Sequence, residues 1–217
     1  EFVLDEGLAI VSDMPMIGRP AALIGIAEKG YATLKVVAPA QGGHSSAPPP
    51  ETGVEVLARA VLAITGKAFP LRFDGPAADM VRALAPAADP MVRVAVANEW
   101  LFAPLLKRTI AATPAGASTL HTTIAPTMLR GSPKENVLPQ DATAWINYRI
   151  APGNTAAEVM QRARDATAGL AVELAWEGTA YDPSPVSSID ADGYRLLAAL
   201  AADDGRIPVA PGLVTAT

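Results

Sequence analysis

Apolar and polar residues alternate along two short stretches of this chain. Every second residue of 31–38 is Ala, Leu or Val, and Val172, Leu174 and Trp176 share one side of residues 172–177. Successive side chains of a β-strand point to opposite faces, so this period of two indicates strands with one buried face. We therefore predict a strand over each stretch.

Two helices are predicted from their start signals. Thr52 is followed three residues later by Glu55, and Thr155 by Glu158, and apolar residues then recur at helical spacing in both cases. In such a capping box the threonine and glutamate side chains each accept a hydrogen bond from a backbone N–H that would otherwise be unpaired. We expect helices to begin directly after Thr52 and Thr155.

Residues 120–129 and 142–150 are rich in β-branched and aromatic residues, which predicts two more strands between these helices. The resulting order is βαββαβ, the order of the ferredoxin-like split βαβ unit. We expect an α+β fold in which a four-stranded antiparallel sheet carries two helices on one face and leaves the other face open.

The ferredoxin-like unit is expected over residues 28–182 and contains a long insertion, residues 66–118. Apolar spacing inside the insertion is helical near residues 77–84 and 91–106. The insertion therefore predicts additional helices.

The flanking segments indicate a second domain. Residues 1–27 have the pattern of a strand end and loops, and residues 183–217 that of a helix over 188–200 and a short strand near 207–209. The first residue is not Met, and the last residues are rich in β-formers without a polar tail. We expect that the chain is part of a longer protein, in which the unit is inserted into this second domain.

Composition excludes several classes of function. Half of the residues are hydrophobic and 18% are charged, which suits a globular chain with a sizeable core. The net charge of -5 and the absence of a Lys/Arg cluster predict no nucleic-acid partner. No apolar run approaches the roughly 20 residues that span a bilayer, so no membrane partner is expected. Without cysteines, a metal ion would have to be bound by carboxylates and histidines.

His44 is the first candidate for chemistry. It lies in a Gly-rich loop, residues 41–48, that follows the first predicted strand. The plain interpretation is a solvent-exposed histidine among turn-forming residues. A serine nucleophile at Ser45 or Ser46 is disfavoured, because the Gly that a nucleophile elbow needs after the serine is missing.

Two other patterns contain polar groups that could bind a ligand. Residues 132–139 form a polar loop that contains Asn136, and Asn147 and Arg149 are two apart in the next strand, so they share a sheet face. A guanidinium can hold a carboxylate through two parallel hydrogen bonds, although an ordinary hairpin with polar surface residues fits the pattern as well. Near the start of the chain, Glu6 fits either a solvated turn or one zinc ligand.

In chain order, four segments resemble the co-catalytic zinc peptidases that include aminoacylase, succinyl-diaminopimelate desuccinylase and Gly-X carboxypeptidase. They are Leu4-Asp5-Glu6-Gly7, Gly43-His44-Ser45-Ser46-Ala47-Pro48, Lys134-Glu135-Asn136-Val137-Leu138-Pro139 and Asn147-Tyr148-Arg149-Ile150-Ala151-Pro152-Gly153. The long insertion most resembles the Gly-X carboxypeptidase and N-acyl-amino-acid hydrolase branch. The resemblance implies a zinc-dependent amidohydrolase or carboxypeptidase that hydrolyses the amide bond of N-acyl amino acids or small peptides with a free carboxylate. The ferredoxin-like unit would be its lid and dimerisation domain, and the flanks would be parts of its catalytic domain.

The same resemblance implies roles for four residues. Glu6 matches a zinc ligand. His44 matches the lid histidine that stabilises the tetrahedral oxyanion, in dimeric members within the active site of the neighbouring subunit. Asn136 matches a polar group beside the substrate, and Arg149 matches the residue that binds its terminal carboxylate. A homodimer formed through the lid, two zinc ions in the complete enzyme and a small-molecule substrate are therefore expected.

Most zinc ligands of that family have no counterpart between residues 1 and 217, and His121, at the start of a predicted strand, is expected to be a surface residue. A catalytic zinc needs three protein ligands. The chain by itself is therefore predicted to be inactive, with the missing ligands before Glu1 and after Thr217. The alternative is a free-standing ferredoxin-like module that dimerises or binds a partner without catalysis.

Overall fold

The computed structural model describes residues 3–4 and 9–215. Backbone contacts divide the chain into two compact units. The first, here named the four-stranded unit, contains Gly30–Phe69 and Thr122–Pro183. The second, the three-stranded unit, contains the described residues up to Lys29, Pro70–His121, and those from Ser184 onward.

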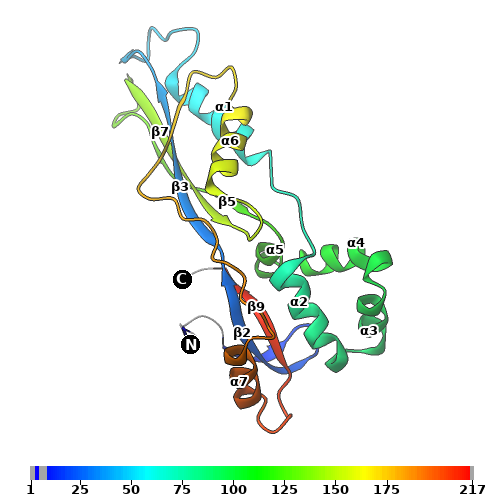
Figure 1. The fold of residues 1–217 in the computed structure, drawn as a ribbon. Coiled ribbons are helices and arrows are strands. Elements are labelled where there is room, and N and C mark those ends of the chain that lie inside the picture. The colour runs from blue at the N-terminus through cyan, green and yellow to red at the C-terminus, as the bar shows by residue number, and fades with distance from the viewer. Residues whose placement is uncertain (1–2, 5–8, 216–217) are drawn as a thin grey trace. The chain divides into compact units, whose positions relative to one another are not determined.

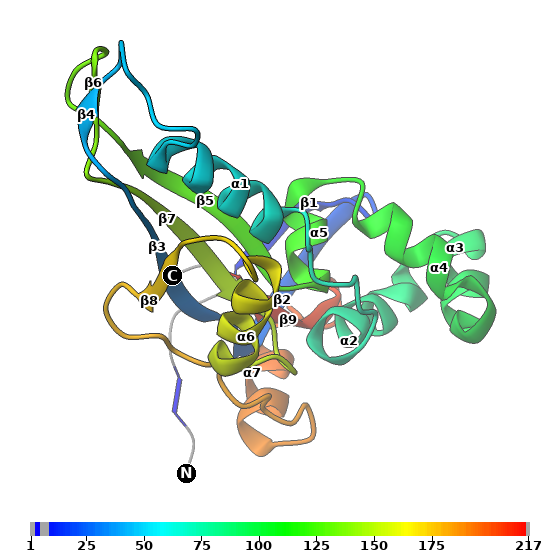
Figure 2. The same ribbon diagram turned by 90° about the horizontal axis from the view of Figure 1, so that it is seen from above.

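The four-stranded unit has the predicted ferredoxin-like topology. Its sheet has the strand order β5-β7-β3-β8, and every neighbouring pair is antiparallel. The strands are β3 (Gly30–Pro39), β5 (Thr123–Arg130), β7 (Asp141–Ile150) and β8 (Glu173–Trp176). Helices α1 (Gly53–Thr65) and α6 (Ala156–Ala166) lie on the same face of the sheet (Figure 1; Figure 2). The expected α+β fold with one open sheet face is confirmed.

Both helices begin at the predicted capping boxes. The Thr52 hydroxyl oxygen accepts a hydrogen bond from the Glu55 N–H at 3.3 Å, and the Thr52 N–H donates to the Glu55 carboxylate at 2.7 Å. Thr155 and Glu158 form the same two bonds at 3.2 and 3.1 Å. An N-cap of this type contributes about 1 kcal/mol to helix stability. Because its two residues are only three positions apart, both helix starts could be predicted from the sequence.

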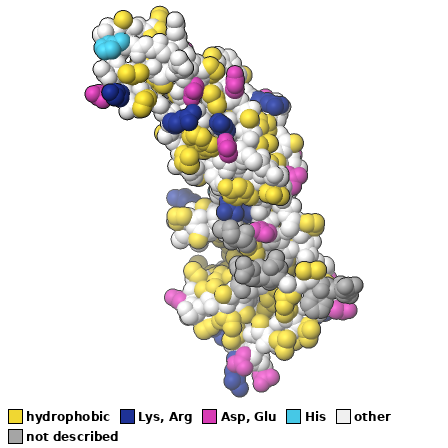
Figure 3. Space-filling view, turned by 90° about the vertical axis from the view of Figure 1, so that its left-hand side faces the viewer, with side chains coloured by type: hydrophobic (Ala, Val, Ile, Leu, Met, Phe, Trp, Pro, Cys, Tyr) yellow, Lys and Arg dark blue, Asp and Glu magenta, His cyan; other side chains and the backbone are white. Residues whose placement is uncertain are grey.

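The core of this unit lies between the sheet and its two helices. Leu34 of β3, Ile146 and Tyr148 of β7, and Val159 of α6 are almost completely buried in one apolar cluster. Most residues that alternate with them along the strands are half-buried or exposed. Figure 3 looks onto this open side of the sheet, where acidic and basic side chains are interspersed with hydrophobic ones.

The three-stranded unit combines a small sheet with several helices. β2 (Arg19–Glu28) lies between β1 (Ile10–Met14), its antiparallel neighbour, and β9 (Val209–Val214), its parallel neighbour. α2 (Gly75–Leu84) packs on β9, where Leu84 joins Ala21 and Ala210 in a buried cluster. The other helices are η1 (Ala85–Ala87), α3 (Pro90–Ala97), α4 (Glu99–Ile110), α5 (Pro114–Leu120) and α7 (Asp192–Ala201). Over the residues described, no helix is long and apolar enough to cross a bilayer.

The prediction of a strand end and loops for residues 1–27 was wrong, because this flank contains β1 and nearly all of β2. Gly18 and Pro20 are typical of loops in sequence. In the structure, Gly18 has a positive φ of 58° in the turn between the two strands, and Pro20 is the second residue of β2. β2 pairs with the adjacent β1 and with β9, which is distant in the chain, and the pairing with β9 leaves no local sequence signal.

The insertion differs from expectation in two details, and Leu120, just after it, in a third. The helical stretch near residues 91–106 is divided into α3 and α4 at Asn98, whose side-chain amide donates to the Val94 carbonyl at 2.9 Å. Leu120, expected in a strand, ends α5. From Pro70 onward, the contacts of the insertion place it in the three-stranded unit, although in sequence it interrupts the four-stranded one.

Gly30 begins β3 where the backbone of residues 181–183 passes very close. A Cβ atom at position 30 would lie 2.3 Å from the Tyr181 carbonyl oxygen and 2.7 Å from the Asp182 carbonyl carbon. Because these are backbone atoms, they could move away only together with the segment that contains them.

We expect Gly30→Ala to lower the free energy of unfolding of the four-stranded unit by about 1–3 kcal/mol, the usual cost of overpacking. Gly131→Ala is the matched control, since its Cβ would meet Cγ2 of Val54 at 3.5 Å, an ordinary contact. Urea unfolding of both variants measures the difference. Equal midpoints for the two variants would contradict the prediction.

Candidate functional site

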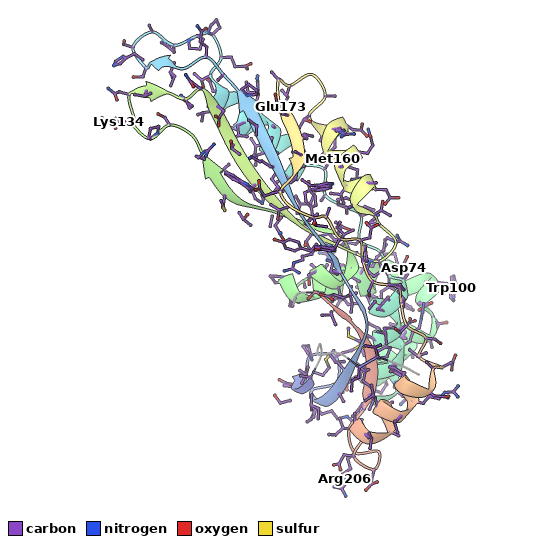
Figure 4. The ribbon with its side chains drawn as sticks, turned by 60° about the vertical axis from the view of Figure 1, so that its left-hand side comes forward. Asp74, Trp100, Lys134, Met160, Glu173 and Arg206 are labelled. Atoms are coloured by element: carbon purple, nitrogen blue, oxygen red, sulfur yellow. The ribbon has the colours of Figure 1, made fainter. Side chains whose placement is uncertain are left out.

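The loops that contain His44 and Asn136 meet at one end of the four-stranded sheet. β4 (Gly43–His44) and β6 (Val137–Leu138) pair antiparallel, and the Ser45 N–H donates to the Asn136 carbonyl at 3.1 Å. Figure 2 shows this pair beyond the ends of β3 and β7, and Figure 4 shows Lys134 at the same end. Two motifs that are distant in the sequence, each expected to be a plain loop, therefore lie side by side.

The imidazole of His44 has a defined donor and a defined acceptor side. Its Nδ1 accepts a hydrogen bond from the Ser46 N–H at 3.2 Å and lies 2.8 Å from the Ser46 hydroxyl oxygen. A backbone N–H can only donate, so Nδ1 has no proton and the neutral ring carries its proton on Nε2. No partner for Nε2 is found in the described part of the chain. His44 therefore presents an exposed N–H donor.

A wide, open hollow of about 880 Å³ lies beside this strand pair. Gly42, Gly43 and Leu138 contribute to its lining, together with Arg130 and Asp141 at the ends of β5 and β7. Arg130 and Asp141 form an ion pair at 3.3 Å and neutralise each other. The hollow therefore contains no unpaired charge from the residues that line it.

Arg149 lies near the opposite end of β7. Its guanidinium lies over the Tyr31 ring of β3, with the central carbon 4.8 Å from the ring centroid. On the same face, the Asn147 amide donates to the Thr33 hydroxyl at 3.1 Å. As expected from their spacing, Asn147 and Arg149 share the half-buried, open side of the sheet.

The length of β7 separates the two groups of candidate residues. Asp141, the first residue of β7, adjoins the β4–β6 pair, and Arg149 is eight residues further along the strand. At about 3.4 Å per residue, this spacing corresponds to about 27 Å. Within one chain, the structure thus brings His44 and Asn136 together and leaves Arg149 far from both.

The residues described do not form a complete metal site by themselves. Glu6, the expected zinc ligand, lies outside them. Within residues 3–4 and 9–215, no three His, Cys, Asp or Glu side chains come together in a way that could hold a metal ion. Because a catalytic zinc needs three protein ligands, this part of the chain does not fit one.

His121 is half-buried at the end of α5, so the expectation of a surface residue at the start of a strand was wrong. Its Nδ1 donates to the Ala117 carbonyl at 2.8 Å, and its own carbonyl accepts a hydrogen bond from the buried Lys29 ammonium at 2.7 Å. Burial has the largest effect on the pKa of the imidazole and lowers it. The bond to Ala117 opposes this effect, and the Lys29 charge lowers the pKa further.

Two residues orient the candidate groups, and neither role was predicted from the sequence. Ser46 orients the His44 ring, and the Tyr31 ring lies against the Arg149 guanidinium. Ser46 is two residues from His44, and serine side chains often form such local bonds, so a signal for it existed. The contact between Tyr31 and Arg149 depends on the register of β3 and β7, which no local pattern shows.

Residues 26–174 match the family described as the peptidase dimerisation domain. The chain belongs to this family of M20 peptidases. The matched residues cover more than half of the chain and include His44, Asn136 and Arg149. The expected family is therefore confirmed.

The chain is 38% identical over 216 residues to the N-fatty-acyl-amino acid synthase/hydrolase PM20D1 of Xenopus tropicalis, covering 98% of this chain and 42% of that protein. It is 31% identical over 206 residues to the probable carboxypeptidase S-like 2 of Dictyostelium discoideum, covering 91% of this chain and 38% of that protein. The chain thus spans about two fifths of the length of these curated relatives.

Among solved structures, the M20 family metallo-carboxypeptidase Sso-CP2 from Sulfolobus solfataricus has a similar fold. The TM-score is 0.60 at 20% sequence identity, and the match covers 92% of this chain and 55% of that one. At this level of identity the likeness supports the fold.

His121 should make the stability of the three-stranded unit depend on pH. Because the pKa of the folded-state imidazole is lowered, the unfolded chain binds a proton at a higher pH than the folded chain does. The free energy of unfolding should therefore fall as the pH drops below about 6.5. His121→Asn does not titrate and should show a smaller fall. Urea midpoints at about pH 7.5 and about pH 5.5 compare the two proteins, and an identical pH dependence would refute the prediction.

Proposed function

We propose that this chain is the lid and dimerisation part of a zinc-dependent amidohydrolase or carboxypeptidase. Its substrate would be an N-acyl amino acid or a small peptide with a free carboxylate. The names of the relatives support this class, since one is an N-fatty-acyl-amino acid synthase/hydrolase and another a probable carboxypeptidase. The observation that carries the proposal is the β4–β6 pair, which presents the Nε2–H of His44 next to the Asn136 loop.

His44 would stabilise the oxyanion that forms when the amide carbonyl is attacked. The two contacts of Ser46 with Nδ1 leave Nε2–H as the outward donor of the neutral ring. Loss of one such donor typically costs about 2.7–4 kcal/mol of transition-state stabilisation, or about a hundredfold to a thousandfold in rate. Asn136, exposed on the adjoining loop, has an amide that could donate to the same substrate.

Arg149 would bind the terminal carboxylate of the substrate. In the part of the chain that the structure describes, its guanidinium lies over the Tyr31 ring and has neither an ion pair nor a side-chain hydrogen bond. The planar guanidinium can form two parallel hydrogen bonds with a carboxylate, which a lysine cannot reproduce.

One substrate molecule cannot reach both groups of the same chain, because about 27 Å of β7 lies between Arg149 and the β4–β6 end. We therefore infer that His44 and Asn136 act in the active site of a second copy, within a homodimer formed through the lid. The description of the family as a dimerisation domain supports this inference. So does edge strand β5, whose Met128 and Leu129 are exposed and available for pairing.

The two zinc ions would be held mainly by residues outside those described, with Glu6 as one ligand. In this proposal residues 28–182 contain the lid domain, interrupted by the insertion 66–118, whose contacts from Pro70 onward place it in the three-stranded unit. Residues 1–27 and 183–217 are parts of the catalytic domain. Because the described residues contain no group of three ligands, the chain by itself should be inactive.

The full-length enzyme should hydrolyse an N-acyl amino acid and a dipeptide, and a chelator should abolish the activity. His44→Ala should lower kcat by about a hundredfold or more, since it removes the oxyanion donor. Ser45→Ala is the matched control, because Ser45 is exposed beside His44 and its side chain makes no hydrogen bond within the described residues. Steady-state kinetics with and without chelator measure all three effects.

A lack of activity on both substrates would favour the alternative, a non-catalytic ferredoxin-like dimerisation or binding module. The absence of a metal-binding group among the described residues is the observation that keeps this alternative open. Labelling of Ser45 or Ser46 by a fluorophosphonate probe would instead indicate a serine hydrolase.

Mixed dimers distinguish action within a chain from action across the dimer. When His44→Ala and Arg149→Ala subunits combine, one site of the mixed dimer keeps both groups if His44 acts in the partner's site. Neither site keeps both groups if His44 acts in the active site of its own subunit. Random mixing makes about half of the dimers mixed, so about a quarter of wild-type activity should return. Activity no higher than that of the separate variants, or sedimentation of the wild type as a monomer, would contradict the dimer proposal.

A further inference from the structure

Tyr31 and Arg149 face each other across β3 and β7 as a closely spaced pair. Both backbone hydrogen bonds of Tyr31 go to the other side of β3, where it donates to Tyr181 at 3.0 Å and accepts from Tyr181 at 2.8 Å. Tyr31 and Arg149 are therefore a non-hydrogen-bonded pair of the antiparallel ladder. In pairs of this type the two side chains lie closer together than in hydrogen-bonded pairs. This explains why the guanidinium lies only 4.8 Å from the ring centroid.

The Tyr31 ring is fixed at both of its ends. The two bonds to Tyr181 hold its backbone, and the Thr33 hydroxyl donates to the Tyr31 hydroxyl oxygen at 3.2 Å. Thr33 in turn accepts a hydrogen bond from the Asn147 amide at 3.1 Å. A ring held in this way is a rigid surface for the flexible side chain of Arg149.

A second cation on the same sheet face shows what distinguishes Arg149. Lys35 lies 5.9 Å from the Trp145 ring centroid and 3.7 Å from the Glu177 carboxylate, so its charge has an aromatic and an acidic partner. Among the residues described, Arg149 has an aromatic partner but no acidic one. Within the same part of the chain, the N–H groups of Arg149, which can bind a carboxylate, have no side-chain hydrogen bond and no ion pair.

We propose that Tyr31 is a positioning residue that holds Arg149 ready for the substrate and thereby sets the preference for a free carboxylate over an uncharged amide. The proposal rests on the proposed role of Arg149 as the carboxylate-binding residue. Tyr31 itself would not touch the reacting atoms. Its effect would be on substrate binding, because an Arg149 side chain without the ring must lose more conformational freedom when the substrate binds.

The experiment compares kcat and KM of the full-length enzyme for an N-acyl amino acid and for the same compound with its carboxylate converted to a carboxamide. Tyr31→Leu removes the π-face but keeps an apolar side chain, and Tyr31→Phe keeps the π-face without the hydroxyl. Trp145→Leu is the matched control, since it removes an aromatic partner of a cation from the same sheet face. Arg149→Ala tests the proposed function separately.

For the carboxylate substrate, Tyr31→Leu should raise KM by about twofold to tenfold, the cost of immobilising one more flexible side chain on binding, and should change kcat by less than about twofold. For the carboxamide substrate its KM should stay near the wild-type value. Tyr31→Phe keeps the ring and its backbone bonds but loses the bond to Thr33, so it should raise KM by less than Tyr31→Leu does. Trp145→Leu should leave KM unchanged. Thermal unfolding of each variant separates these effects from a loss of folded protein.

The possible failures differ from one another. If Arg149→Ala keeps the wild-type preference for the carboxylate, the proposed role of Arg149 is wrong and the role of Tyr31 falls with it. If Arg149→Ala abolishes the preference but Tyr31→Leu does not weaken it, the role of Tyr31 alone is wrong. A fall in kcat on both substrates for Tyr31→Leu, or an equal rise in KM for Trp145→Leu, would also overturn the positioning role.

Discussion

The pairing of β3 with β7 is the constraint on which the four-stranded unit depends. It runs without a register shift from Gly30 opposite Ile150 to Pro39 opposite Asp141. Leu34 and Ile146 are fully buried on one side of this ladder. A slip of one residue by either strand would turn the apolar side chains of that strand, Leu34 or Ile146 among them, to the open face, so burial of the core specifies the register.

The same register places the candidate functional residues. At one end it sets Tyr31 opposite Arg149. At the other end β3 and β7 lead into the loops that contain β4 and β6, where His44 and Asn136 adjoin. The geometry of both ends thus follows from apolar residues that take no part in the chemistry, and Gly30 is needed because the chain beside the first strand residue leaves no room for a Cβ.

The parts of the fold that could be predicted are those with local signals. The capping boxes at Thr52 and Thr155, the alternation along β3 and β8 and the β-branched and aromatic residues of β7 are local features, so they were visible without a structure. β2 was missed although it pairs with the adjacent β1, since its other partner, β9, is distant in the chain. The β4–β6 pair was missed because each strand is only two residues long. Pairing between distant segments leaves no periodic pattern to read.

The candidate site shows the same division. His44, Asn136 and Arg149 could be named from motifs, whereas the contacts that orient them could not be named, and Glu6 lies outside the described residues. Ser46 was within reach of sequence analysis because it is local to His44. Tyr31 was not within reach, since it meets Arg149 only through the β3–β7 register.

The stiffness of the ladder has a consequence for function. A paired strand is extended and hydrogen-bonded along its length, so the distance of about 27 Å along β7 cannot be closed by a change of side-chain rotamers. An oxyanion donor and a carboxylate-binding residue that serve one small substrate must lie no further apart than that substrate and its two hydrogen bonds span, which is far less than the length of β7 between them. The two groups of this chain can meet that requirement only if each is completed by another molecule, which makes a second copy of the chain part of the proposed active site.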